Sequence, residues 1–372
     1  MPRLLLVLLL GAAAADTQRA PGGGEMPELP RISASDLSDP SSPYYSGGRP
    51  FVLQLNATAR PSPPVPPLPP SPHPTLSRGR RCGQGLGSAH SQWSVAWFRE
   101  NFGDEIVDWY PTNMIDIQNK PYLRPFRDIG RDWDAAGSPE WEARHSTPYV
   151  QWRLQMRTWR RLKKTLGGLP KWFTVDESWL KSCLPPRTSA EWPADNWLRH
   201  CHWKVLVIGK RGSGMFFHAD GIATATYQLQ VVGRKRWTVC GPEQRDKLYG
   251  PGEVDTFDVD LRRFPRFAEA RCTRTITQPG EILYYPTGWW DSPATRARCF
   301  VPRPRESNAA CRWHQTDNLD SDTIGLAARR VDRFNYDKVY RELKHKCDHP
   351  SPDIVRPPAP LLFCGFWLLL RG

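Results

Sequence analysis

The sequence predicts an α+β protein with a core of antiparallel strands, a β-sandwich or jelly roll, flanked by helices. After Trp203, short runs rich in β-branched and aromatic residues alternate with Gly, Pro and charged turns. These runs are WKVLVIG, ATYQLQVVG, KRWTVC, TRTITQ and EILYYP. Most of them are too close together for helical crossovers, which favours antiparallel pairing. The 17 Trp and 14 Phe among 372 residues are enough to fill a buried core.

The first residues have the features of a secretory signal peptide. A basic residue is followed by an apolar run over Leu4–Leu10 and then by small residues. The run is too short to cross a bilayer. We therefore expect residues 1–16 to direct the chain to the secretory pathway, as an endoplasmic reticulum lumenal or secreted protein. The alternative is an uncleaved apolar N-terminus or a wrongly assigned start codon.

The secretory route would place the nine cysteines in an oxidising compartment. Their odd number leaves at least one unpaired within the chain, and the sequence leaves the pairings open. No CxxC pair or Cys/His cluster has the spacing of a structural zinc site. The triplet Asn56-Ala57-Thr58 is an N-glycosylation sequon, which has meaning only on this route.

Residues 17–81 are predicted to be a disordered, proline-rich region. The segment Pro61–Pro74 reads PSPPVPPLPPSPHP, which favours an extended polyproline conformation because proline fixes φ and lacks a donor. We interpret it as a semi-rigid spacer rather than a ligand for proline-recognition modules.

The folded domain is expected to span residues 82–347. Its first part, 82–200, has a mostly helical pattern, and the strand runs predict a barrel over 201–330. The pattern at 331–347 predicts one more helix beside the barrel. The apolar stretch in the tail, 348–372, is too short to cross a membrane.

The formal net charge of +13 would suit an anionic partner such as nucleic acid or a membrane surface. The densest basic stretch is Arg153–Lys164, where apolar residues recur at steps of three and four. Those residues are Trp152, Met156, Trp159 and Leu162. This spacing is typical of a helix with one buried face and one solvated basic face. We therefore expect neither nucleic acid nor, beyond secretory targeting, a membrane as partner.

A possible metal site lies in the strand-rich part, in the run GMFFHADG. Because strand side chains alternate between faces, His218 and Asp220 project to the same side, where an imidazole and a carboxylate can share one cation. The triplet HxD alone is a weak signal, since polar residues at such spacing are common on surfaces.

Two downstream segments make the pattern more specific. They are YQLQVVGRKRW, starting at Tyr227, and QPGEILYYPTGWW, starting at Gln278. The order HxD, V-x-G-x-K-x-W, then P-G-E-I-L-x-x-P-x-x-W-W resembles the JmjC family of Fe(II)- and 2-oxoglutarate-dependent oxygenases, over roughly Trp93 to Cys347. The resemblance implies a double-stranded β-helix (jelly-roll or cupin) core with flanking helices on its N- and C-terminal sides.

The resemblance also implies roles for single residues. His218 and Asp220 match the first two ligands of a 2-His-1-carboxylate triad, which leaves positions on Fe(II) for 2-oxoglutarate and oxygen. Lys235 matches the lysine that pairs with the distal carboxylate of 2-oxoglutarate, because a buried carboxylate needs such a partner. Gln228 stands where relatives often carry a polar residue near this cosubstrate. The alternative for Lys235 is a solvated turn lysine between two arginines.

The third ligand departs from the family pattern. Relatives place a histidine directly after the aromatic pair, whereas Asp291 follows Trp290 here. The family continuation appears later, at WHQTDNLD, so residues 291–313 look like an insertion, either a retained intron in the gene model or a true loop at the barrel mouth. His314 is therefore the predicted third ligand, and Asp291 is the less favoured alternative.

The leading functional hypothesis is an oxygenase that hydroxylates a side chain of a protein, with N-methyl demethylation possible by the same first step. A secretory-pathway protein is the expected substrate, and a small molecule is a further candidate. The first alternative is a non-catalytic cupin-fold binding protein with a disrupted metal site. The second is a basic nucleic-acid binder, for which the sequence offers only charge. An intact three-ligand site would separate the first hypothesis from the other two.

Overall fold

The computed structural model describes residues 26–45, 48–55, 86–111, 121–135, 147–170, 204–220, 224–286 and 313–330, with residues 173, 335, 338–339 and 341 in addition. The expected signal peptide, the polyproline run, residues 291–312 of the expected insertion and the tail 348–372 lie outside these residues. Most of the expected helix 331–347 lies outside them as well.

Two sheets form the centre of the molecule. Their strands are β1 (Arg31–Ile32), β2 (Phe51–Gln54), β3 (Ile106–Tyr110), β4 (Tyr122–Pro125), β5 (Tyr149–Arg153), β6 (Lys204–Gly209), β7 (Gly214–Ala219), β8 (Ala225–Val232), β9 (Lys235–Cys240), β10 (Cys272–Thr277), β11 (Glu281–Tyr285), β12 (Trp313–Asn318) and β13 (Thr323–Arg330). The nine-stranded sheet has the order β1-β2-β11-β8-β13-β6-β5-β3-β4, and the four-stranded sheet has the order β10-β9-β12-β7. Only the pairing of β1 with β2 is parallel; every other strand pair of the described residues is antiparallel.

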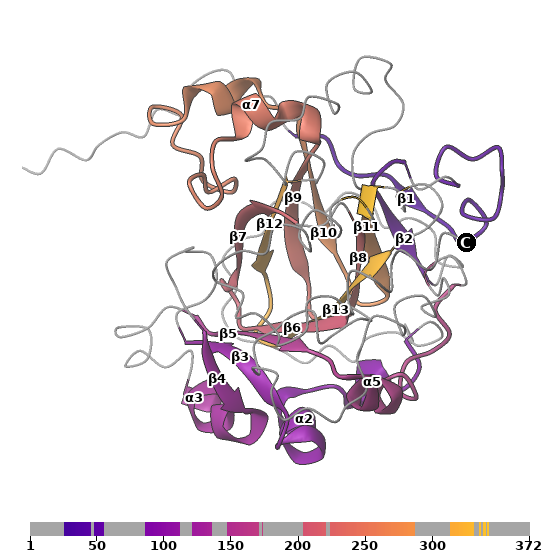
Figure 1. Ribbon diagram of the computed structural model, residues 1–372, viewed down its shortest axis with the longest axis vertical. Coiled ribbons are helices and arrows are strands. Elements are labelled where there is room, and N and C mark those ends of the chain that lie inside the picture. Colours follow the sequence, from indigo (N-terminus) through magenta and orange to yellow (C-terminus); the bar gives the residue numbers. More distant parts are fainter. Residues whose placement is uncertain are drawn as a thin grey trace, which may run out of the picture.

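The strands from β6 to β13 cross repeatedly between the two sheets. β6, β8, β11 and β13 lie in the larger sheet, while β7, β9, β10 and β12 lie in the smaller one (Figure 1). The five predicted strand runs coincide with β6, β8, β9, β10 and β11. This arrangement is consistent with the expected double-stranded β-helix, whose two sheets enclose a space that side chains or a ligand can fill.

Short helices surround the barrel. They are α1 (Ala89–Gln92), α2 (Val95–Phe102), α3 (Gly130–Ala135), α5 (Met156–Leu162) and α7 (Arg245–Leu248), with 3₁₀ helices η1 (Phe126–Ile129), η4 (Pro242–Gln244) and η5 (Pro265–Glu269). Figure 1 shows α2, α3 and α5 at one end of the molecule and α7 at the other.

The main core lies on the outer face of the nine-stranded sheet. Trp152 on β5 is fully buried there, and its ring meets those of Phe98, Phe102 and Phe126 at centroid distances of 5.7, 5.4 and 5.5 Å. The Ser94 side chain caps α2 by accepting a hydrogen bond from the backbone N–H of Trp97, which supplies one of the free amides of the first turn with a partner. α2 and η1 are thereby packed against β5.

The expectation of a mostly helical segment over 82–200 is incomplete: its described residues hold α1, α2, α3 and α5, but also the strands β3, β4 and β5. The runs IVDWY and YVQWR are short and aromatic, and periodicity alone does not separate such runs from helix. The expected basic helix over Arg153–Lys164 is likewise shorter than predicted. Trp152 and Arg153 end β5, and the helix α5 begins only at Met156.

The expectation of disorder over 17–81 is wrong for residues 26–45 and 48–55. β2 pairs with β11, and Phe51, Val52 and Leu53 are fully buried. The prolines at 61–74 dominate the composition of this region, so the short apolar run at residues 51–53 was not recognised as a strand. The folded part of the chain therefore begins well before Cys82.

The segment between β9 and β10 covers the outer face of the four-stranded sheet. Phe264, Phe267 and Leu248 pack there with Phe217 and Trp313. A buried disulfide joins Cys240 to Cys272, which lie opposite one another on β9 and β10. The sequence left this pairing open.

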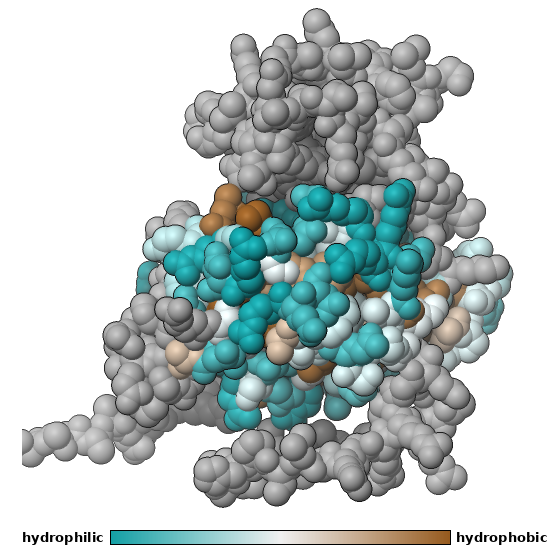
Figure 2. Space-filling model, turned by 90° about the horizontal axis from the view of Figure 1, so that it is seen from below, coloured by the Kyte–Doolittle hydropathy of each residue, from teal (hydrophilic) through white to brown (hydrophobic). Residues whose placement is uncertain are grey.

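The face of the molecule seen from below in Figure 1 is mostly hydrophilic (Figure 2). Among the described residues, the large apolar side chains with substantial exposure are Ile106, Tyr122 and Leu123, on β3 and β4. No helix within the described ranges has the length and apolarity needed to span a membrane.

Candidate metal centre

A cavity of about 380 Å³ lies between the two sheets. Strand alternation decides which side chains reach it. On β5, Val150 and Trp152 join the outer core, while Tyr149, Gln151 and Arg153 line the cavity. These three residues were missed in the sequence because their segment was taken as helical, although the alternation in YVQWR could have revealed them.

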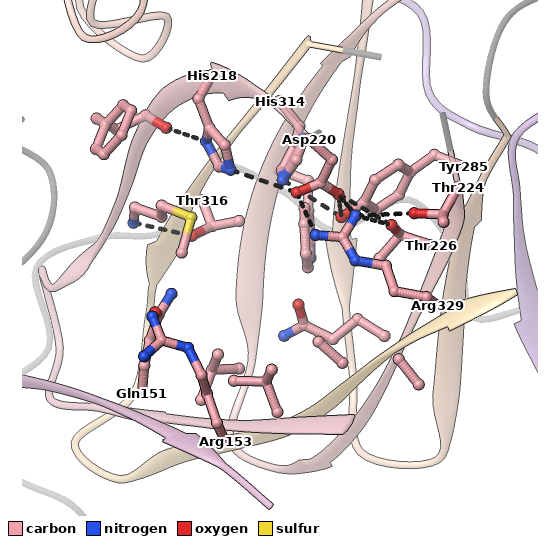
Figure 3. Close-up of a pocket in the computed structure, with 18 of the residues that line it drawn as sticks. Gln151, Arg153, His218, Asp220, Thr224, Thr226, Tyr285, His314, Thr316 and Arg329 are labelled. Atoms are coloured by element: carbon pink, nitrogen blue, oxygen red, sulfur yellow. Dashed lines mark hydrogen bonds and ion pairs between the residues drawn. The ribbon is translucent and has the colours of Figure 1, made fainter. Parts of the chain in front are cut away.

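His218, Asp220 and His314 meet at one end of this cavity, as Figure 3 shows, and their ligand atoms all lie within 4.8 Å of one another. His218 is near the end of β7, and Asp220 follows that strand directly. The antiparallel register of β7 and β12 sets His314 opposite His218, with ring centroids 4.2 Å apart. The structure thus brings together the three residues named as ligands. Asp291 lies outside the described residues.

The imidazole of His218 is held by its own strand. Its Nδ1 lies 2.7 Å from the backbone carbonyl oxygen of Phe216, and when Nδ1 donates to that oxygen the lone pair is on Nε2. Nε2 lies 3.8 Å from Oδ1 of Asp220. Burial lowers the pKa of His218, and the charge of Asp220 opposes this only in part. The neutral ring that results is the form that binds metals.

Asp220 is surrounded by donors. Arg329 Nη1 lies 2.6 Å from its Oδ2 and Arg329 Nη2 donates to its Oδ1 at 2.9 Å, while the hydroxyl of Thr226 donates to Oδ2 at 2.9 Å. Burial would raise the pKa of Asp220, but Arg329, followed by His314 and His218, lowers it well below its usual range. The carboxylate is therefore ionised, as a metal ligand must be.

Arg329 and Tyr285 were missed in the sequence. Arg329 is on β13 in the run TIGLAARR, where Gly325 and Ala327 precede it at two-residue steps on the same face. A long basic side chain after two small residues on one face of a buried strand is the signal that could have revealed it. Tyr285 ends β11, and its hydroxyl lies 3.3 Å from Nε2 of His314.

Lys235 is 1% exposed, so the alternative of a solvated turn lysine is wrong. Its Nζ lies 5.9 Å from the ring centroid of Tyr149 and 5.8 Å from that of Trp237, and both rings line the cavity. Burial lowers the pKa of Lys235 to about 7, against the charge of Asp317, which raises it. A buried amine of this kind is stabilised by an anion placed beside it.

Gln228 lies on β8 and faces the cavity. Its side-chain Nε2 is buried and has no hydrogen-bond partner among the described residues. A buried donor without a partner is costly, so it favours a ligand with an acceptor at this position.

Two histidines and one carboxylate meet on the inner side of two facing sheets, an arrangement that suits a facial metal triad. The family model described as a cupin-like domain matches residues 168–314, a stretch that ends on His314. The HSPB1-associated protein 1 of Rattus norvegicus is 33% identical over 96 residues, which cover 23% of this chain and 20% of that protein.

Two further relatives have names that describe an activity. The 2-oxoglutarate and iron-dependent oxygenase JMJD4 of Homo sapiens is 28% identical over 172 residues, 44% of this chain and 36% of that protein. The arginine-specific demethylase JMJ20 of Arabidopsis thaliana is 30% identical over 92 residues, 23% of this chain and 20% of that protein. The chain thus spans well under half the length of these relatives. Each of these similarities covers less than half of the chain, and together with the cupin-like match they support a relation to the JmjC-type cupin proteins.

Proposed function

We propose that this chain is an Fe(II)- and 2-oxoglutarate-dependent oxygenase that hydroxylates a side chain of a protein substrate. The observation that supports it best is the convergence of His218, Asp220 and His314 on one end of a cavity between the sheets. Two imidazoles and one carboxylate suit Fe(II) and leave open positions for a chelating oxo acid and oxygen. When bound, iron and 2-oxoglutarate supply the oxidising power that side chains lack.

The residues of the chain would bind and orient the reactants. His218, Asp220 and His314 would hold the iron, and Lys235 would pair with the distal carboxylate of 2-oxoglutarate. Gln228 would donate to an acceptor of the cosubstrate, since its amide nitrogen has no partner among the described residues. Val207 and Trp237 line the cavity and limit the entry of water, which strengthens these polar contacts.

Hydroxylation and demethylation begin with the same step on a C–H bond, so the site alone suits both reactions. One relative is named an arginine-specific demethylase and another an oxygenase, which supports a protein substrate. We propose simple hydroxylation as the outcome, because it needs no N-methyl group on the substrate.

We also propose that the protein acts in the secretory pathway. The apolar run Leu4–Leu10 supports this proposal, as does the disulfide between Cys240 and Cys272. Disulfides persist in oxidising compartments and are rare in the cytosol.

A second candidate is the non-catalytic cupin. It is favoured by Arg329, whose guanidinium contacts both oxygens of Asp220 and would compete with a metal for that ligand. Metal binding decides between the two candidates.

The test is an anaerobic titration of the full chain with Fe(II) and then with 2-oxoglutarate, followed through the visible charge-transfer band of the chelate. We expect the band in the parent protein and in Asp291→Ala, and its loss in His314→Ala. The aspartate variant is the matched control, because Asp291 is the alternative third ligand. A band that survives in His314→Ala and disappears in Asp291→Ala would identify Asp291 as the third ligand instead of His314. No band in the parent would favour the non-catalytic cupin.

A further inference from the structure

The guanidinium of Arg329 is an unusual neighbour for a metal ligand. It reaches the cavity from β13 and contacts both oxygens of Asp220, at 2.6 and 2.9 Å (Figure 3). Its Nη1 also donates to the hydroxyl of Thr226 at 2.9 Å and to that of Thr224 at 3.4 Å. The ion pair is largely buried, with side-chain exposures of 28% for Arg329 and 13% for Asp220.

The two oxygens of Asp220 differ in their surroundings. Oδ2 also accepts from Thr226, at 2.9 Å, whereas Oδ1 is the oxygen 3.8 Å from Nε2 of His218. Oδ1 is therefore the oxygen that points toward the other ligands. The donor on Oδ1 is Nη2 of Arg329.

A metal ion bound to Oδ1 would compete with Nη2 for the electron density of that oxygen. It would also bind beside a fixed positive charge in a poorly screened site, where like charges repel strongly. Both effects weaken the binding of metal alone.

An anionic cosubstrate reverses these effects. The chelating carboxylate of a 2-oxo acid would bring negative charge to the metal and an acceptor within the same cavity that Arg329 lines. We propose that Arg329 makes metal binding depend on the cosubstrate: it competes with the metal for Asp220 when the oxo acid is absent and pairs with the oxo acid's carboxylate when it is present. This inference rests on the proposed function.

Linkage provides the test, since coupling between two ligands is reciprocal. Co(II), which does not support turnover, is titrated into the full chain by calorimetry, with and without saturating 2-oxoglutarate. The coupling factor is the affinity for Co(II) with 2-oxoglutarate divided by the affinity for Co(II) without it. Direct chelation of the metal by the oxo acid contributes to this factor in every variant. The part due to Arg329 is the difference between the parent and Arg329→Gln.

In Arg329→Gln we expect Co(II) alone to bind at least about five-fold more tightly than in the parent, and the coupling factor to fall by at least about five-fold, the lower end of typical coupling. Arg329→Lys keeps the charge but cannot contact both oxygens at once, so we expect intermediate values. This variant also preserves the test if the glutamine variant does not fold.

The matched control is Arg234→Gln. It removes the same charge from the barrel, but Arg234 pairs with Asp320 at the surface, with side-chain exposures of 35% and 31%. We expect its coupling factor to equal that of the parent.

Two results would overturn the inference. The first is weaker binding of Co(II) alone in Arg329→Gln, which would mean that Arg329 orients Asp220 for the metal rather than competing with it. The second is an unchanged coupling factor in that variant, which would mean that Arg329 does not link metal binding to the cosubstrate. In both cases the parent still binds metal and oxo acid, so the proposed function stands. If the parent binds neither, the proposed function fails first.

Discussion

Lys235 is a buried amine that lies behind two rings of the cavity wall, those of Tyr149 and Trp237. A charge-assisted contact with a carboxylate contributes about 1.5–3 kcal/mol, so we expect Lys235→Met to weaken 2-oxoglutarate binding on the order of ten- to hundred-fold. Calorimetry on the Co(II)-loaded protein measures this change. Lys210→Met is the control, because Lys210 pairs with Asp322 at 3.2 Å and lies over the ring of Trp133, which does not line the cavity. Equal affinities in the parent and in Lys235→Met would place the cosubstrate carboxylate elsewhere.

The pH dependence of stability follows from the same residue. Burial lowers the pKa of Lys235 from 10.5 to about 7. Between pH 7 and 10.5 the unfolded chain keeps this proton while the folded chain has lost it, so the free energy of unfolding contributed by Lys235 rises with pH across that window. Below pH 7 both states are protonated and the contribution is constant. Urea unfolding of the parent and of Lys235→Met across this range checks the sign, and a slope that persists in the variant would belong to another group.

We expect the affinity for 2-oxoglutarate to fall as pH rises, whereas the stability contributed by Lys235 rises. The carboxylate favours the charged amine, so we expect binding to weaken as pH rises above about 7 in the parent. In Lys235→Met this pH dependence should be absent. The measurement is the dissociation constant of 2-oxoglutarate on the Co(II)-loaded protein at several pH values. A parallel loss of affinity in both proteins would point to titration at the metal instead.

At the scale of elements, β5 lies between the aromatic core on one face of its sheet and the cavity on the other. Its Trp152 packs against α2 and η1 on one face of the sheet, while Gln151 and Arg153 line the cavity on the other. Arg153 also pairs with the buried Asp108 of β3, at 2.7 Å. The position of the cavity wall therefore depends on the aromatic core behind it.

We expect Trp152→Ala to lower the free energy of unfolding by about 3–5 kcal/mol, because it removes a fully buried indole from a packed aromatic cluster. Urea denaturation measures the loss. Tyr122→Ala is the control on a neighbouring strand, since Tyr122 is 58% exposed, and its effect should stay within about 0.5 kcal/mol. Comparable small effects in both variants would show that the cluster does not fix β5.

At the scale of the whole molecule, the N-terminal residues are part of the barrel. Phe51 on β2 stacks on Tyr284 of β11, with ring centroids 4.9 Å apart, and is fully buried. We expect Phe51→Ala to cost about 3–5 kcal/mol and to lower the midpoint of the single unfolding transition. Ser38→Ala, at an exposed position, is the control with little expected change. Stability unaffected by Phe51→Ala would mean that residues 48–55 do not belong to the cooperative unit.

The sequence predicted β6, β8, β9, β10 and β11 because their runs are rich in β-branched and aromatic residues and bounded by turns. It failed for β2 and β5, which are short aromatic segments that gain their conformation from pairing with β11 and β6. Of the candidate site, His218, Asp220 and His314 could be named from spacing and resemblance. The strand pattern around Arg329 could have marked it as facing inward, but the contacts of Arg329 and Tyr285 with Asp220 arise only when β13 and β11 pair with β8.

The place of β12 in its sheet has a further consequence. This strand is hydrogen-bonded on both sides, to β7 and to β9, so cross-strand register fixes His314 independently of the chain distance from β11. Lengthening the connection ahead of Trp313 adds a closure entropy that grows only with the logarithm of its length. Deleting one residue inside β12 would instead turn the imidazole to the opposite face. Changes in the length of the chain between β11 and β12 would therefore leave the position of His314 intact, whereas a change in the length of β12 would not.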